Sequence, residues 1–307
     1  MLNNLLFILT ITFINSVPLT LAALGGVICE KSGVVNIGIE GMMSIGAFTG
    51  AAVGYYTGSV WLGLIFAGLA GGLLALLHAI ASITFQADQT VSGIAINLIG
   101  PGLAMFLSRI FFAGATTTIP VPQKFPKIFS SLANKHEILN NINLDMTVPL
   151  SFSVVLITWF VMYKTKWGLR IRALGEHPAA VDSVGVSVYR TRYICVALSG
   201  ILAGIGGASV TLAIVSQFTP SAISGQGFIA LAAVIFGKWK PFGAYFACLF
   251  FGFAQALVVL IGGEGSVISS DLLMMLPYLL TVLILILFVG RSSAPKASGK
   301  PYQRGSR

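Results

Sequence analysis

Long runs of apolar residues, separated by short polar segments, make up most of this chain of 307 residues. Several of these runs approach the roughly 20 residues that cross the hydrocarbon core of a bilayer as a helix, and the seventh is short. The predicted spans are Leu5–Ile28, Val34–Tyr56, Val60–Thr84, Val91–Phe112, Val148–Tyr163, Tyr193–Val215, Gly227–Phe236, Phe242–Ile261 and Leu272–Val289. The pattern therefore predicts a single domain, residues 1–307, that is an all-α polytopic transmembrane helical bundle. We expect about nine spans, in a range of about eight to ten, because the stretch 217–237 also suits a re-entrant segment.

Three polar segments interrupt or follow the apolar runs: residues 113–147, 164–192 and 290–307. Segment 164–192 is the largest charged island, and a polar loop of this kind between two spans is suited to docking another subunit. If it is cytoplasmic, the alternation of loops places 14 of the 18 Lys and Arg residues on its side of the membrane. We therefore expect a cytoplasmic coupling loop at 164–192, an outer loop at 113–147 and an outer N-terminus. The cytoplasmic basic tail 290–307 is expected to contact anionic lipid or a partner.

Composition and charge narrow the functional class. Hydrophobic residues make up 56% of the chain and charged residues only 9%, which excludes an ordinary soluble protein. The net charge of +9 would suggest nucleic acid binding in a soluble protein, but here most basic residues flank apolar runs, so no nucleic acid partner is expected. The three cysteines are isolated and the three histidines are scattered, so no metal site and no cofactor are indicated. Glu30 occupies a position where a phosphate-binding loop requires glycine, and no catalytic triad can be assembled, so the chain is not expected to be an enzyme.

Small residues recur every four positions in several of the predicted spans. In lipid, where apolar side chains gain nothing from leaving water, close approach of small residues is a main source of helix association. These residues predict tight packing within the bundle and not a particular function; they are Gly46, Gly50, Gly54, Gly68, Gly72, Gly200, Gly204 and Ala208.

Polar residues inside predicted spans are candidates for a substrate pathway. Asn36 and Glu40 lie four residues apart, and therefore on one helix face, in GVVNIGIEG at the start of the second span. Ionisable groups inside a membrane mostly face a cavity or a partner. Glu40 lies only about two turns into the span, so contact with a neighbouring helix or with the cytoplasmic loop is an equal alternative to substrate contact.

A second polar series enters the fourth span. Gln89, Gly93 and Asn97 form one stripe at intervals of four residues, and Ser92 lies beside it. The stripe either lines a pathway or forms hydrogen bonds between helices. Gln217, Gln226 and Gln255 are weaker pathway candidates of the same type, and Gln255 is included in the predicted pathway set.

Several motifs together resemble a known transporter family. These are GVVNIGIEGMMSIGAF, SGIAINL, WGLRIRALGEHPAAVDSVGV, LSGILAGIGGA, GFIALAAVIFGKWKPFGA and GRSSAPKASGKPY, which cover well over half of the chain. In this order they resemble one permease subunit of a nucleoside-type ABC importer, within the ribose, galactoside and branched-chain amino acid permease group. The resemblance implies a multi-pass protein of the bacterial plasma membrane. It also implies a second homologous permease subunit, ATP-binding subunits that hydrolyse ATP, and a substrate-binding lipoprotein that delivers a nucleoside.

The resemblance also assigns a coupling helix. The segment Gly175–Gly185 matches the group's coupling helix for the ATPase, with Glu176, Pro178, Asp182 and Gly185 as its recognisable elements. The chain departs from the group's usual pattern of Asn, Pro and a basic residue, since it has His177, Pro178 and Ala179. An apolar face of Ala180, Val181 and Val184 would be left exposed in water, and we expect only the ATPase to cover it.

Two other functions are weighed against a nucleoside importer. The first is the same kind of importer for a simple sugar such as ribose or galactose. The second, an ion-coupled secondary transporter, is disfavoured because it does not need the long polar loop and because paired intramembrane carboxylates are scarce.

Overall fold

We describe a computed structural model of the chain, which covers residues 2–128, 144–262 and 294–303 together with positions 275, 279 and 282. The described residues form helices and one isolated β-bridge, between Lys127 and Asp145. The helices are α1 (Leu2–Lys31), α2 (Ile39–Thr57), α3 (Val60–Ala79), α4 (Gln89–Phe111), α7 (Thr147–Lys164), α8 (Lys166–Glu176), α9 (Pro178–Ser183), α10 (Val188–Ser209), α11 (Gln226–Phe236) and α12 (Pro241–Ile261). Short π-helical turns, Ile80–Thr84 and Val210–Ile214, extend α3 and α10.

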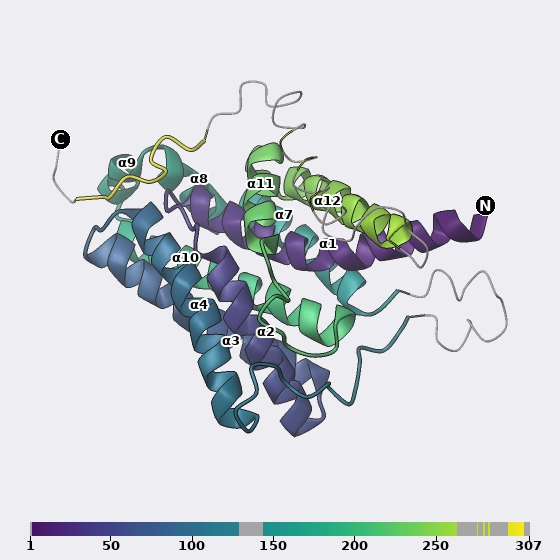
Figure 1. Cartoon of the computed structure of the whole chain (residues 1–307). Helices are drawn as coiled ribbons and strands as arrows, with labels where there is room; N and C mark the ends of the chain where they lie inside the picture. Colours follow the sequence, from purple (N-terminus) through teal and green to yellow (C-terminus); the bar gives the residue numbers. More distant parts are fainter. Residues whose placement is uncertain are drawn as a thin grey trace.

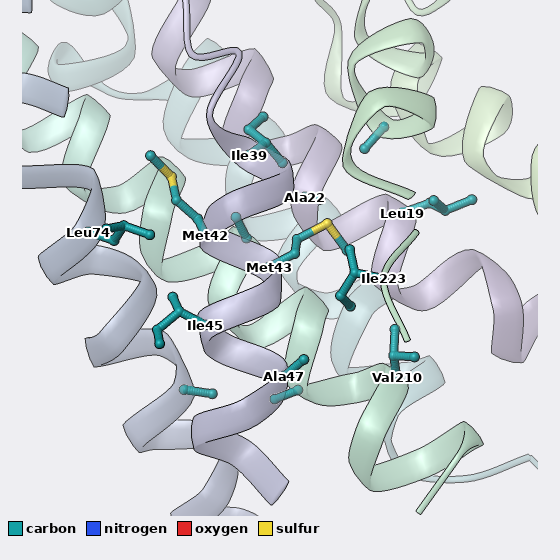
Figure 2. Close-up of a cluster of buried hydrophobic side chains, with 14 of the residues drawn as sticks. Leu19, Ala22, Ile39, Met42, Met43, Ile45, Ala47, Leu74, Val210 and Ile223 are labelled. Carbon is teal, nitrogen blue, oxygen red and sulfur yellow. The ribbon is translucent and has the colours of Figure 1, made fainter. Parts of the chain in front are cut away.

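Helix α2 lies at the centre of the packing, against α3, α4, α10 and α11 (Figure 1). It is built largely from Gly, Ala and Met, and 13 of its 19 residues are buried. Successive side chains of α2 serve different neighbours: Met43 is directed toward Ile223, while Met42 points to the opposite side, where Leu74 of α3 lies (Figure 2). Helix α1 crosses the molecule beside α10, α11 and α12. The all-α prediction is therefore confirmed for the described residues.

The number of spans differs from the prediction. Among the described residues, six helices are long and apolar enough to cross a membrane: Leu5–Lys31, Val60–Thr84, Gln89–Phe111, Thr147–Lys164, Val188–Ile214 and Pro241–Ile261. Helix α2 is not among them, because its small and polar residues suit a position inside the protein better than contact with lipid. Helix α11 has only 11 residues. The predicted span 272–289 lies outside the described residues apart from three isolated positions, so the count of about nine is not confirmed.

The outer segment packs against the protein where it is described. Val121 donates its backbone N–H to Ser216 at 2.8 Å, and the Thr118 hydroxyl accepts the N–H of Phe218 at 2.9 Å. Val121 and Phe125 are buried. Thr118, Val121 and Phe125 therefore anchor the described part of the predicted outer loop to the protein, while most of its other residues are exposed.

The recurring small residues lie where helices meet. A Cβ atom added to Gly46 would collide with the backbone of Gly204, and one added to Gly50 would approach Cβ of Ala208 to 2.7 Å. Helices α2 and α10 thus touch along their backbones. The sequence-based prediction that these residues serve packing is confirmed for Gly46, Gly50, Gly204 and Ala208.

We expect Gly46→Val to destabilise the bundle strongly. The new side chain forces α2 away from α10, and overpacking of a closed core typically costs about 1–3 kcal/mol or more. Thermal unfolding in detergent, followed by size-exclusion chromatography, measures the effect. Gly102→Ala in α4 is the matched control, because a Cβ atom there meets nothing within 4 Å. Equal stability of the two variants would contradict the backbone contact.

Candidate functional site

The loop between α1 and α2 is the centre of a buried hydrogen-bond network. Asn36 in this loop is fully buried, and its Nδ2 donates to Oγ of Ser199 on α10 at 3.0 Å and contacts Sδ of Met42 at 3.4 Å. The non-helical segment between α1 and α2 is therefore linked to α10 by the side chain of Asn36. Asn36 has a structural partner on each side and does not line the cavity described below.

The polar stripe of α4 binds the same loop. Gln89 accepts the backbone N–H of Val35 through Oε1 at 2.7 Å. Asn97 accepts the N–H of Gly41 through Oδ1 and donates from Nδ2 to the carbonyl of Ile37, both at 2.9 Å. The loop leaves backbone groups without helical partners, and the two amide side chains satisfy three of them. The sequence left two alternatives for this stripe, a pathway lining or hydrogen bonds between elements. These contacts are hydrogen bonds between elements.

Ser92 forms a hydrogen bond with His78. Its Oγ lies 2.9 Å from Nδ1 of His78, and Nε2 of His78 lies 3.0 Å from the carbonyl oxygen of Val35. A carbonyl only accepts, so Nε2 carries the proton and the Ser92 hydroxyl donates to Nδ1. His78 is fully buried, and the pair links α3 and α4 to the loop.

Glu40 binds the first turn of α11. Its Oε1 accepts the backbone N–H of Gly225 and its Oε2 accepts that of Gly227, both at 2.6 Å. The free N–H groups at a helix N-terminus, together with the helix dipole, favour a negative charge at this position. A Cβ atom on Gly227 would approach the backbone of Glu40 to 2.6 Å, so glycine permits the close approach. The carboxylate therefore holds α11 against α2.

A cavity of about 400 Å³ lies beside this first turn, between α1, α11 and α12. Its polar lining residues are Asn15, Ser221, Ser224, Gln226 and Gln255, and its apolar lining residues are Ala222, Ile223, Ile229, Val258 and Val259. Its volume is in the range of small-molecule binding sites. Of the six predicted pathway residues, only Gln255 lines it. Glu40 binds the neighbouring first turn of α11, and the hydrogen bonds around the loop between α1 and α2 involve Asn36, Gln89, Ser92 and Asn97.

Among the lining residues, Gln226 was a weaker candidate from the sequence and Asn15 was missed. Asn15 was hidden in the first apolar run, where a single amide far from any charged residue gives little signal. Gln226 is the first residue of α11 and directly precedes the apolar residues of that helix. Asn15 becomes a candidate only once α1 is placed beside α11 and α12.

The predicted coupling segment forms two short helices, α8 and α9, joined at His177. Pro178 lies in the first turn of α9, as expected, and Glu176 is the last residue of α8. Gly185 ends the segment with φ at 80°, a left-handed conformation that suits glycine. Glu176 is exposed, and Val184 is 75% exposed.

The expectation that only a partner covers the apolar face of this segment is wrong for Val181. Val181 is only 5% exposed, because it packs with Leu174 and Val188, and Tyr302 of the C-terminal tail packs against this cluster. The Tyr302 hydroxyl also donates to Oδ2 of Asp182 at 3.1 Å. Residues 294–303 run along α8 and α9 (Figure 1), and we call them the strap. The strap was missed because its residues are polar and carry no periodic pattern.

The predicted cytoplasmic elements gather at one end of the bundle. A Cβ atom on Gly175 would meet the carbonyl of Lys31, at the end of α1. Trp239, in the turn before α12, donates its indole N–H to Oε2 of Glu30. Glu30 therefore has a structural partner, and the ends of α1, α8 and α11 are joined.

Comparisons with known proteins give the family. Residues 8–287 match a protein family described as "Branched-chain amino acid transport system / permease component". The chain is 45% identical to the guanosine ABC transporter permease protein NupQ of Bacillus subtilis (strain 168), with 96% of each chain covered. It is 39% identical to the nucleoside ABC transporter permease protein NupC of Lactococcus lactis subsp. cremoris (strain MG1363), with 98% of each covered.

A more distant relative is the guanosine ABC transporter permease protein NupP of Bacillus subtilis (strain 168), 26% identical over 94% of this chain and 83% of that protein. No solved structure matches the chain significantly. Because the family description covers residues 8–287 and six described helices suit a bilayer, the chain is a multi-pass protein of the bacterial plasma membrane and belongs to the family of branched-chain amino acid transport system permease components.

Proposed function

We propose that this chain is the transmembrane permease subunit of an ABC importer that moves nucleosides into the cytoplasm. The observation that carries the proposal is the identity of 45% and 39%, over nearly the whole length, to permeases named for guanosine and nucleosides. The cavity beside α11 supports it, because none of its described lining residues is ionisable. A neutral solute needs no charge partner, and burial of a charged group without one is costly.

In this proposal the interrupted region supports the pathway. The loop before α2 and the first turn of α11 lie on either side of Glu40, and the cavity opens next to that turn. Irregular backbone at membrane depth is tolerated where it is buried in protein or lines a cavity. Asn36, Gln89, Ser92 and Asn97 hold the α2 side of this region, while Gln255 contacts the solute. High affinity resides in the binding lipoprotein, since a pathway must release its cargo.

The partners follow from the same family. Bacillus subtilis has two related permease proteins named for guanosine transport, NupQ and NupP, and this chain resembles both. We propose that it pairs with a second homologous permease, while separate subunits hydrolyse ATP. The α8–α9 segment, on the cytoplasmic side with the tail, docks an ATP-binding subunit through Glu176, Pro178, Asp182, Gly185 and the exposed Val184. Val181 supports the segment from within. The outer segment 113–147 faces the binding lipoprotein.

Uptake competition tests the solute class. In cells that express the chain with its partner subunits, uptake of labelled adenosine or uridine is expected to fall in the presence of unlabelled nucleosides and to be unaffected by free ribose. The reverse ranking would move the chain to the sugar importers. As a control, the purified chain without other subunits is expected to show no ATP-dependent accumulation in liposomes; accumulation would contradict the role of a permease subunit.

A further inference from the structure

Three primary amide side chains meet at the cavity from three different helices. Asn15 comes from the middle of α1, Gln226 from the start of α11 and Gln255 from α12. Asn15 is only 9% exposed. An amide offers two donors and one acceptor with two lone pairs, so the three together present a dense set of neutral hydrogen-bonding groups.

The amide of Gln226 has unused hydrogen-bonding capacity. Its Oε1 atom is buried and has no hydrogen-bond partner among the described residues. A buried polar atom without a partner costs free energy, and of the six such side-chain atoms among the described residues this is the one that belongs to a residue lining the cavity. The neighbours of Gln226 in sequence, Gly225 and Gly227, are both held by the Glu40 carboxylate at 2.6 Å. The backbone that carries this amide is therefore fixed in place.

The remaining lining residues are aliphatic apart from Ser221 and Ser224. Ile223 and Ile229 lie on the α11 side, and Val258 and Val259 lie on α12 one turn beyond Gln255. On a helix, positions three and four apart share a face, so Gln255 and these two valines point to the same space. The cavity thus combines flat apolar surfaces with amides and holds no ionisable side chain among its described lining residues.

We infer that Gln226, Gln255 and Asn15 recognise the base of the nucleoside during its passage and set the preference among bases. A nucleobase has two faces of low polarity, which suit the aliphatic walls, and an edge of donors and acceptors. Asn and Gln side chains pair with such edges, as in the bidentate contact with adenine. A free sugar has hydroxyl groups around its whole ring and fits these aliphatic walls less well. The inference rests on the proposed function and names the part of the solute that this site reads.

The test uses proteoliposomes that hold the complete transporter, with saturating binding protein, and measures initial uptake of adenosine, guanosine and uridine. Gln226→Met and Gln255→Met keep the length of each side chain and remove its hydrogen bonds. We expect the ratios among the three rates to change about two- to tenfold, as loss of single hydrogen bonds predicts. Leu260→Ala is the matched control, because Leu260 lies on α12, is 41% exposed and does not line the cavity. If each variant slows all three nucleosides by one common factor, the inference is wrong.

A labelling experiment gives a second readout that does not depend on transport rates. The three native cysteines are buried, so a maleimide should modify mainly the introduced thiol of Gln255→Cys. We expect adenosine to protect this thiol and ribose to leave it reactive. If the wild-type transporter imports nucleosides but no nucleoside protects the thiol, the inference is wrong and the proposed function is unaffected. A wild type that imports ribose and no nucleoside would instead overturn the proposed function.

Discussion

Replacing Glu40 by alanine is expected to reduce uptake by more than tenfold and to lower the thermal stability of the purified chain. The carboxylate accepts backbone N–H groups from Gly225 and Gly227 at 2.6 Å each. Without it, both donors lose their partner in a buried region, at a cost of about 1–3 kcal/mol for each. The first turn of α11, and with it the amide of Gln226, then loses its fixed position. Uptake assays and melting in detergent measure the two effects.

Two further variants make this prediction specific. Glu40→Gln retains one carbonyl acceptor, so it should keep part of the stability and part of the uptake, because a charged acceptor binds N–H groups more strongly than a neutral one. Thr49→Ala is the control on the same helix: its hydroxyl bonds only the carbonyl of Ile45, one turn earlier, so little should change. Wild-type uptake and stability in Glu40→Ala would contradict the role of the carboxylate as a clamp on α11.

The local features of the sequence predicted much of this arrangement. Apolar runs located the helices, and the spacing of Gly46 and Gly50 located a face along which α2 meets α10. The position of Glu40 near the start of a predicted span indicated a carboxylate that needs a partner. Its partners, Gly225 and Gly227, lie 185 and 187 residues away, and backbone donors leave no signature in a sequence. The sequence could therefore predict that Glu40 needs a partner, but it could not identify Gly225 and Gly227 as the partners.

The cavity and the strap depend on tertiary contacts in the same way. Asn15 and Gln255 are separated by most of the chain and meet because α1 packs along α12. The basic tail offered only a charge pattern, which indicated a membrane surface or a partner. Its backbone N–H at Ala297 instead donates to the carbonyl of Gly175 at 2.8 Å, at the end of α8. Sequence patterns report burial well, but they do not tell which distant segment provides it.

The strap joins the α8–α9 segment to the body of the protein. Arg192 of α10 donates from Nη1 to the carbonyl of Lys300 at 3.2 Å, and from Nε to that of Ser32 at 3.3 Å. The Tyr189 hydroxyl donates to the carbonyl of Tyr302 at 2.9 Å, and Tyr302 in turn bonds Asp182 of α9. A short helix of six residues has little stability of its own, so these contacts keep α9 at a fixed angle to α10. We propose that the strap lets α9 transmit force as a rigid unit.

Tyr302→Ala is therefore expected to uncouple the assembled transporter: ATP hydrolysis continues but no longer rises with loaded binding protein, and uptake falls about tenfold. The variant uncovers Val181 and removes an aromatic side chain that is only partly buried, which should cost less than the roughly 3–5 kcal/mol of a fully buried one, so the bundle should still fold. Tyr302→Phe keeps the packing and should lose far less. Val184→Asp, at a side chain that is 75% exposed and outside the strap, should instead release the ATP-binding subunit, which pull-down detects. If Tyr302→Ala also released that subunit, the strap would be part of the docking surface itself, and if it kept full coupling, the strap would have no mechanical role.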